Sequence, residues 1–176
     1  MQTKISDEQL IRLTKDFFQS IDFDYFNKIN TILDHTNSDF KLNISTLSNI
    51  ENAVGNPNEQ HPINIDVRQY GDLRDIYGLV HELTHCLDVD KGDNTTRQLL
   101  GEIAPQCMER LLDNFLIKQS NSEKFDIDTL LEDIEKRKYT TFLSRMKNVQ
   151  HFFELEDQKD KGIIHRRKNF RANKGC

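Results

Sequence analysis

The chain has 176 residues, a formal net charge of −5, 36% hydrophobic residues and 30% charged residues. This length suits one ordinary domain, and the composition supports a hydrophobic core beneath a strongly polar surface. No apolar run approaches the roughly 20 residues that a membrane-spanning helix needs, and the acidic balance argues against a general nucleic-acid binder. We therefore expect neither a membrane nor a nucleic acid as a partner.

Glycine and proline are scarce, with seven and three residues, which is too few for the many turns of a β-sandwich or barrel. The expected fold class is therefore mainly α. The N-terminus lacks the apolar core of a signal peptide, and three cysteines at irregular positions form no disulfide framework (Cys86, Cys107 and Cys176). A cytoplasmic location is expected, with Cys86 and Cys107 in the core.

The first third of the chain predicts two helices, a loop and a strand. Ser6 and Gln9 match a capping box, and apolar residues then recur at helical spacing to residue 21. A second helix is expected over 24–35, followed by an asparagine-rich loop with short irregular elements over 36–60. Apolar and polar residues alternate over 63–67, which predicts a strand with one buried face. We expect it to be an edge strand.

The remainder of the chain predicts further helices. Apolar residues recur at helical spacing over 72–88, with Asp72 as the N-cap. A polar turn is expected over 88–96, and helices over 96–118, 127–138 and 140–156. The predicted organisation is one domain over 1–158 and a basic C-terminal tail over 159–176, which we interpret as a solvated run of charge.

One motif carries recognisable chemistry: residues 81–85 read His-Glu-Leu-Thr-His, an HExxH sequence inside the predicted helix 72–88. Positions four apart lie about 40° apart around a helix axis, so His81 and His85 project from one face and can share a tetrahedral metal. Zinc suits two neutral imidazoles. Glu82 lies beside the first histidine, where it can accept a proton from a metal-bound water near neutral pH.

Acidic residues nearby can complete the site. Glu102 lies 17 residues after His85 on the next predicted helix, where it can supply a third ligand and leave the fourth position for water. Glu109 lies two helical turns farther along the same face, where it can hydrogen-bond a ligand histidine. Asp88, seven residues after His81, can do the same from the first helix.

These motifs resemble the zinc-dependent oligopeptidases of the thimet oligopeptidase and oligoendopeptidase F type. Residues 74–85 look like that family's metal helix, and residues 101–109 look like its second helix, in which an acid ligand precedes another glutamate by seven residues. The resemblance implies a zincin-like helical catalytic core of the gluzincin type with a short edge strand or small sheet. It also implies one zinc ion per chain, with His81, His85 and Glu102 as ligands and Glu82 as general base.

Three features depart from the family pattern. Thr84 stands where the family usually has glycine, and the chain is too short to build the N-terminal enclosure that restricts those peptidases to short peptides. No counterpart of the C-terminal segment that binds the substrate carbonyl follows residue 156. The side chains available to replace that carbonyl donor are Tyr70, Tyr77, Tyr139, His151 and His165.

We therefore expect a zinc metalloendopeptidase that cleaves peptides or a flexible segment of a protein, with strand 63–67 pairing with the extended substrate backbone. Two alternatives stay open. The first is a regulatory protease of one partner protein, resembling the small zincins that cleave phage repressors. The second is a non-catalytic zinc-binding or interaction module derived from an oligopeptidase.

Overall fold

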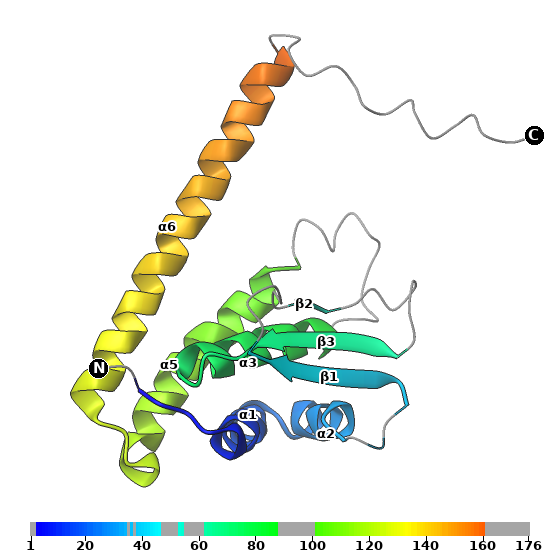
Figure 1. Cartoon of the computed structure of the whole chain (residues 1–176), viewed down its shortest axis with the longest axis vertical. Coiled ribbons are helices and arrows are strands. Elements are labelled where there is room, and N and C mark those ends of the chain that lie inside the picture. Colours follow the sequence, from blue (N-terminus) through cyan, green and yellow to red (C-terminus); the bar gives the residue numbers. More distant parts are fainter. Residues whose placement is uncertain are drawn as a thin grey trace, which may run out of the picture. The chain divides into compact units, whose positions relative to one another are not determined.

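The structure is a computed structural model that describes residues 3–34, 36, 38–46, 53–54, 62–87 and 101–160. The chain divides into two compact units, Met1–Asp133 and Ile134–Cys176. The described part is mainly helical, as expected, and holds one small sheet (Figure 1). No helix in these ranges combines the length and the apolarity that crossing a bilayer requires.

The first two helices are α1 (Asp7–Ile21) and α2 (Phe23–Ile32). The predicted capping box is confirmed, because the Ser6 hydroxyl accepts the Gln9 N–H and the Gln9 side chain accepts the Ser6 N–H. Asp22 alone separates the helices, and its carboxylate caps α2 by accepting two backbone N–H groups. The buried face of α1 consists of Leu10, Leu13, Thr14, Phe17 and Phe18.

The sheet contains β1 (Phe40–Ser45), β2 (Ala53–Val54) and β3 (Ile63–Arg68) in the order β1-β3-β2. The strand expected over 63–67 is confirmed, with every second residue buried. It is central, however: β3 runs parallel to β1 and antiparallel to β2. The prediction of an edge strand that is free to pair with a substrate is therefore wrong, because β1 formed within the segment expected to be a loop.

Helix α3 (Leu73–Leu87) follows β3 and packs against that strand, α1 and α5 (Ile103–Glu123). Cys86 on α3 is buried, as expected, and burial raises the pKa of its thiol to about 12. Cys107 on α5 is exposed, so the prediction of a core position is wrong. The buried stripe of α5 instead follows Leu112, Phe115 and Leu116.

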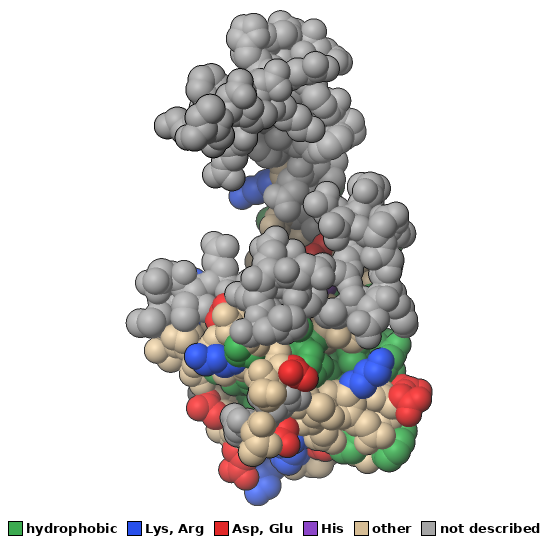
Figure 2. All heavy atoms as spheres, turned by 90° about the vertical axis from the view of Figure 1, so that its right-hand side faces the viewer, with side chains coloured by type: hydrophobic (Ala, Val, Ile, Leu, Met, Phe, Trp, Pro, Cys, Tyr) green, Lys and Arg blue, Asp and Glu red, His purple; other side chains and the backbone are tan. Residues whose placement is uncertain are grey.

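Helix α6 runs without interruption over Ile127–Asp160, so the prediction of separate helices over 127–138 and 140–156 is wrong. No glycine or proline occurs in this segment to end a helix. The predicted turn over 88–96, the first residues of the helix expected over 96–118 and nearly all of the basic tail lie outside the described residues. Acidic and basic side chains are interspersed on the face shown in Figure 2.

Candidate metal centre

The connection between β3 and α3 fixes where α3 begins. Asp72 precedes the helix and accepts the Arg74 N–H at 3.1 Å, which confirms the predicted N-cap. The buried carboxylate of Asp75 accepts the backbone N–H groups of Tyr70 and Gly71, each at 2.7 Å. Gly71 has a φ of 72°, a conformation that favours glycine. The turn into α3 is therefore held by specific hydrogen bonds as well as by packing.

The structure brings together the three predicted ligands. His81 and His85 lie one turn apart on α3, with their Nε2 atoms 3.2 Å apart. Glu102 immediately precedes α5, and its Oε2 lies 3.2 Å from His81 Nε2 while its Oε1 lies 3.4 Å from His85 Nε2. One potential ligand atom from each residue lies within 4.8 Å of the others. A helix pair thus assembles two imidazoles and a carboxylate at one point.

The separations of these atoms are close to those of a tetrahedral metal site. Zinc bonds to histidine nitrogen and carboxylate oxygen are about 2.0–2.2 Å long, so two ligand atoms on one tetrahedral ion lie about 3.3–3.5 Å apart. The two Nε2 atoms are 3.2 Å apart, and the Glu102 carboxylate lies 3.2 Å from one through Oε2 and 3.4 Å from the other through Oε1, so these separations lie within or just below this range. The Glu102 side chain is 60% exposed, so a fourth ligand can reach the group from solvent. The residues present therefore fit zinc, and this donor set also suits other divalent transition metals.

Glu109 lies where it was expected, behind the first histidine. Its Oε1 is 2.8 Å from His81 Nδ1. A proton on Nδ1 that is donated to Glu109 leaves the Nε2 lone pair directed toward the candidate ligand group. Burial by itself lowers the pKa of His81, but the hydrogen bond to Glu109 and the neighbouring carboxylates raise it above its ordinary value. Asp88 lies outside the described residues, and its predicted contact stays a prediction.

Glu82 is buried on α3 beside His81. Burial raises its pKa to about 7, the charge of His81 lowers it and the charge of Glu102 raises it. A carboxyl group with this pKa is partly ionised near neutral pH and can both accept and return a proton. Its position and its pKa therefore suit a general base.

Sequence reasoning missed one buried contact between the same helices. The Tyr77 hydroxyl donates a hydrogen bond to Asp113, and both side chains are buried. Tyr77 lies one turn before His81, and Asp113 lies one turn after Glu109, so the contact continues the line of polar pairs. The four-residue spacing of Tyr77, His81 and His85 is the signal that could have revealed it.

Two of the candidate carbonyl donors have other partners. Tyr77 is bonded to Asp113, and the Tyr70 ring lies beneath the guanidinium groups of Arg74 and Arg68, with centroid distances of 3.8 and 4.8 Å. Tyr139 belongs to the second unit. Neither the side chain of His151 nor any part of His165 is among the described residues.

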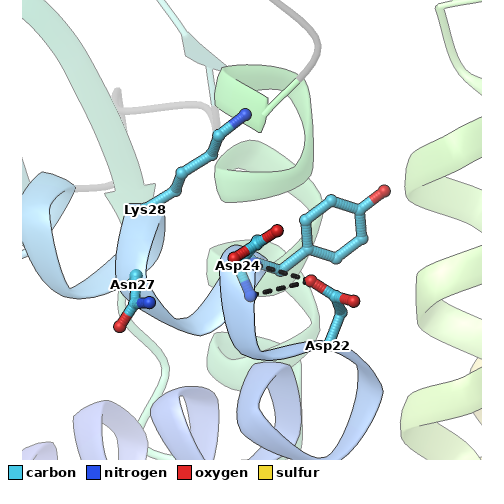
Figure 3. Close-up of a pocket in the computed structure, with 5 residues that line it drawn as sticks. Asp22, Asp24, Asn27 and Lys28 are labelled. Carbon is cyan, nitrogen blue, oxygen red and sulfur yellow. Dashed lines mark hydrogen bonds between the residues drawn. The ribbon is translucent and has the colours of Figure 1, made fainter.

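A hollow of about 500 Å³ lies at the start of α2, away from the candidate ligands in sequence and in its lining residues (Figure 3). Two acids line this hollow. Asp22 caps α2, because its carboxylate accepts the backbone N–H groups of Asp24 and Tyr25. We therefore interpret this carboxylate as structural. The hollow is lined by Asp22, Asp24, Tyr25, Asn27 and Lys28.

The centre on α3 and α5 is thus defined by its own geometry: three candidate ligands, a histidine-orienting carboxylate and a buried acid with a raised pKa. Comparison of the chain with protein-family models, with curated proteins and with solved structures finds no match.

Proposed function

We propose that the chain is a zinc-dependent metallopeptidase with a zincin-like core, in which His81, His85 and Glu102 hold one zinc ion. The observation that carries this proposal is the convergence of three side chains: the two Nε2 atoms are 3.2 Å apart, and the Glu102 carboxylate approaches His81 through Oε2 at 3.2 Å and His85 through Oε1 at 3.4 Å. Glu82 supplies a candidate general base, because this buried carboxyl lies next to His81 on α3 and burial raises its pKa to about 7.

The mechanism assigns a separate task to each residue. Zinc, when bound, polarises the substrate carbonyl and lowers the pKa of the attacking water. Glu82 removes a proton from that water and delivers it to the leaving amine. Glu109 keeps His81 in the tautomer and orientation that present Nε2 to the ion.

The open side of the site bears on the substrate. The exposed Glu102 side chain lies at the surface, where an extended peptide or a flexible segment of a protein can approach. Because β3 is paired on both sides, the substrate backbone does not add to β3 as first expected. A protease of one partner protein would use the same centre and differ only in what it cleaves.

A non-catalytic zinc-binding module is the second candidate, and a specific observation favours it. Tyr77 and Tyr70 engage Asp113 and two arginines, so neither is committed to a substrate carbonyl. Losing such a donor lowers the rate by about 100- to 1,000-fold in known enzymes. A chain with intact zinc and no hydrolysis would fit this description.

The test combines metal analysis with hydrolysis of a mixed peptide library. We expect one zinc per chain in the wild type and in Glu82→Gln, and none in His81→Ala. Glu82→Gln should lower the hydrolysis rate by about 100- to 10,000-fold because the general base is lost. Glu132→Gln, which changes an exposed glutamate on α6, is the matched control and should leave both quantities unchanged.

Each outcome decides between the candidates. Wild-type protein that takes up no zinc overturns the metal centre, and full activity in zinc-loaded Glu82→Gln overturns the mechanism. Stoichiometric zinc without hydrolysis of any peptide supports the non-catalytic module. Circular dichroism of each variant shows whether the fold is retained.

A further inference from the structure

One side of α5 carries a line of exposed apolar side chains that begins beside the candidate metal centre. Ile103 directly follows Glu102 and is 55% exposed. Cys107 is exposed one turn later, and Leu111 is 44% exposed one turn after that. We call Ile103, Cys107 and Leu111 the α5 stripe. The helix that follows one candidate ligand therefore also offers apolar surface to a molecule that approaches this ligand from solvent.

The α5 stripe lies apart from the face of α5 that contacts α3. Successive helical residues are about 100° apart around the axis, so the stripe begins about 100° from Glu102 and reaches about 180° at Leu111. Glu109 and Asp113, which bond to side chains of α3, lie within about 20° of the direction of Glu102. The stripe thus runs along α5 beside the helix contact without taking part in it.

The spacing of the α5 stripe is close to that of an extended peptide. Four residues of an α-helix rise about 6.0 Å. Alternate residues of an extended chain point to the same side and are about 6.6–6.8 Å apart. Over the two intervals of the stripe the mismatch is only about 1.2–1.6 Å. Every second side chain of a peptide laid along α5 can therefore meet one residue of the stripe.

Starting from the metallopeptidase proposed above, we propose that the α5 stripe binds apolar side chains at alternating positions of the peptide substrate, on one side of the bond to be cleaved. Only the place of the cleaved bond rests on the proposed function. The Glu102 side chain is 60% exposed, so a peptide that reaches the open side of the site passes next to Ile103. The substrate class is then an extended peptide, or a flexible segment of a protein, in which apolar residues alternate with polar ones.

A second copy of the chain is the competing occupant. A stable protein interface buries about 800 Å² on each partner. Even large aromatic side chains bury only about 150–250 Å² each, and the stripe holds two partly exposed aliphatic side chains and one cysteine. The stripe by itself is therefore too small for a stable dimer, whereas its size suits a few side chains of one peptide.

The first experiment measures peptide binding by fluorescence anisotropy, with zinc-loaded Glu82→Gln so that the peptide stays intact. A labelled peptide with leucine at every second position should bind at least about threefold more tightly than one of the same composition with its leucines in one block. Ile103→Ser and Leu111→Ser, added singly, should each raise the dissociation constant at least about fivefold. Asn121→Ser, at an exposed position of α5 about 15 Å beyond Leu111, is the matched control and should change it less than about twofold.

The second experiment uses Cys107 to locate the bound peptide. Cys86 is buried, and Cys176→Ser removes the third cysteine, so iodoacetamide then reports on Cys107. Saturating alternating peptide should slow the alkylation of Cys107 at least about fivefold, because the peptide covers the middle of the stripe. Circular dichroism of each variant shows whether the fold is retained.

Neither measurement requires hydrolysis, and each is repeated without zinc, so the two proposals can fail separately. A chain that binds the alternating peptide through the stripe but takes up no zinc or cleaves nothing supports the stripe and overturns the metallopeptidase. Equal affinity for the two peptides, unchanged affinity in both serine variants, or full reactivity of Cys107 under saturating peptide overturns the stripe. Sedimentation equilibrium adds one further result: a wild-type dimer that Ile103→Ser dissociates would assign the stripe to a second copy and overturn its role in peptide binding.

Discussion

Tyr77 and Asp113 form one end of the polar contact between α3 and α5, and both side chains are buried there. His85 and Glu102 form the other end, where the Glu102 side chain is 60% exposed. We call these the closed end and the open end. At the closed end both partners are buried, so replacing either one removes a buried hydrogen bond, and the contact serves stability. At the open end the same kind of pairing leaves ligand atoms within reach of solvent, so it can serve metal binding.

The difference between the two ends predicts that Glu102→Ala weakens zinc binding but leaves the stability of the metal-free fold nearly unchanged. We expect the affinity for zinc to fall more than about 100-fold. Replacing a residue that only hydrogen-bonds a metal ligand typically lowers the affinity about 10- to 100-fold, and replacing a ligand itself should lower it further. The free energy of unfolding of the metal-free protein should change by less than about 0.5 kcal/mol, because the side chain is exposed. Chelator competition and urea unfolding measure the two quantities. Unchanged zinc affinity would show that Glu102 is not a ligand.

At the closed end the opposite result is expected. Asp113→Ala should lower the free energy of unfolding by about 2 kcal/mol, because it removes the buried hydrogen bond from Tyr77 and the ion pair with Arg110. Zinc affinity of the folded protein should stay within about twofold. Urea unfolding of Asp113→Ala, Tyr77→Phe and the double variant gives the coupling between the two side chains. A coupling near zero would contradict the hydrogen bond.

Glu109 lies between the two ends, and its replacement should have an intermediate effect on the metal. Glu109→Gln keeps an acceptor for His81 Nδ1 but removes the charge, so we expect zinc affinity to fall about tenfold, or about 1.4 kcal/mol. Isothermal titration with zinc measures this change. A loss as large as that of Glu102→Ala would indicate that Glu109 itself binds the ion.

The Arg12–Glu123 pair joins α1 to α5, with the arginine side chain 45% exposed and the glutamate side chain 9% exposed. Arg12 donates to both carboxylate oxygens of Glu123, and these hydrogen bonds lower the pKa of Glu123 below its ordinary value of 4.5. A depressed folded-state pKa gives stability above the unfolded pKa, and this stability is lost as the pH falls through the folded-state pKa.

We therefore expect Arg12→Gln to destabilise the protein by at most about 1 kcal/mol at pH 7, and by less below pH 4.5. Urea unfolding at both pH values tests this. Arg12→Gln that destabilises equally at both pH values would contradict the role of the Glu123 charge.

Features governed by local signals were predictable from the sequence. The capping box of α1, the alternation of β3 and the Asp72 cap of α3 each depend on a few neighbouring residues. The spacing of His81 and His85 places both rings on one face for the same reason. The distances from Glu102 to these rings depend on how α5 packs against α3, and no local signal encodes that packing.

The errors came from tertiary context and from composition. The strand β1 lies in an asparagine-rich stretch, although Phe40, Leu42 and Ile44 alternate with polar residues. Because β1 pairs with β3 on one side and β2 pairs with it on the other, β3 is central. Cys107 belongs to an apolar pattern on α5, but the buried stripe follows Leu112 and Leu116 instead. Periodicity identifies a helix more reliably than it identifies which face is covered.

The central position of β3 has a consequence for how a metal would be captured. Amide hydrogens in a strand bonded on both sides exchange with solvent slowly, and α3 continues directly from that strand through the Asp75 hydrogen bonds. The two histidines lie on this same helix, whereas Glu102 lies at the exposed start of α5. We expect amide hydrogens of α3 to exchange more slowly than those at the start of α5, so that the two histidines are held in place while the region of Glu102 opens more often.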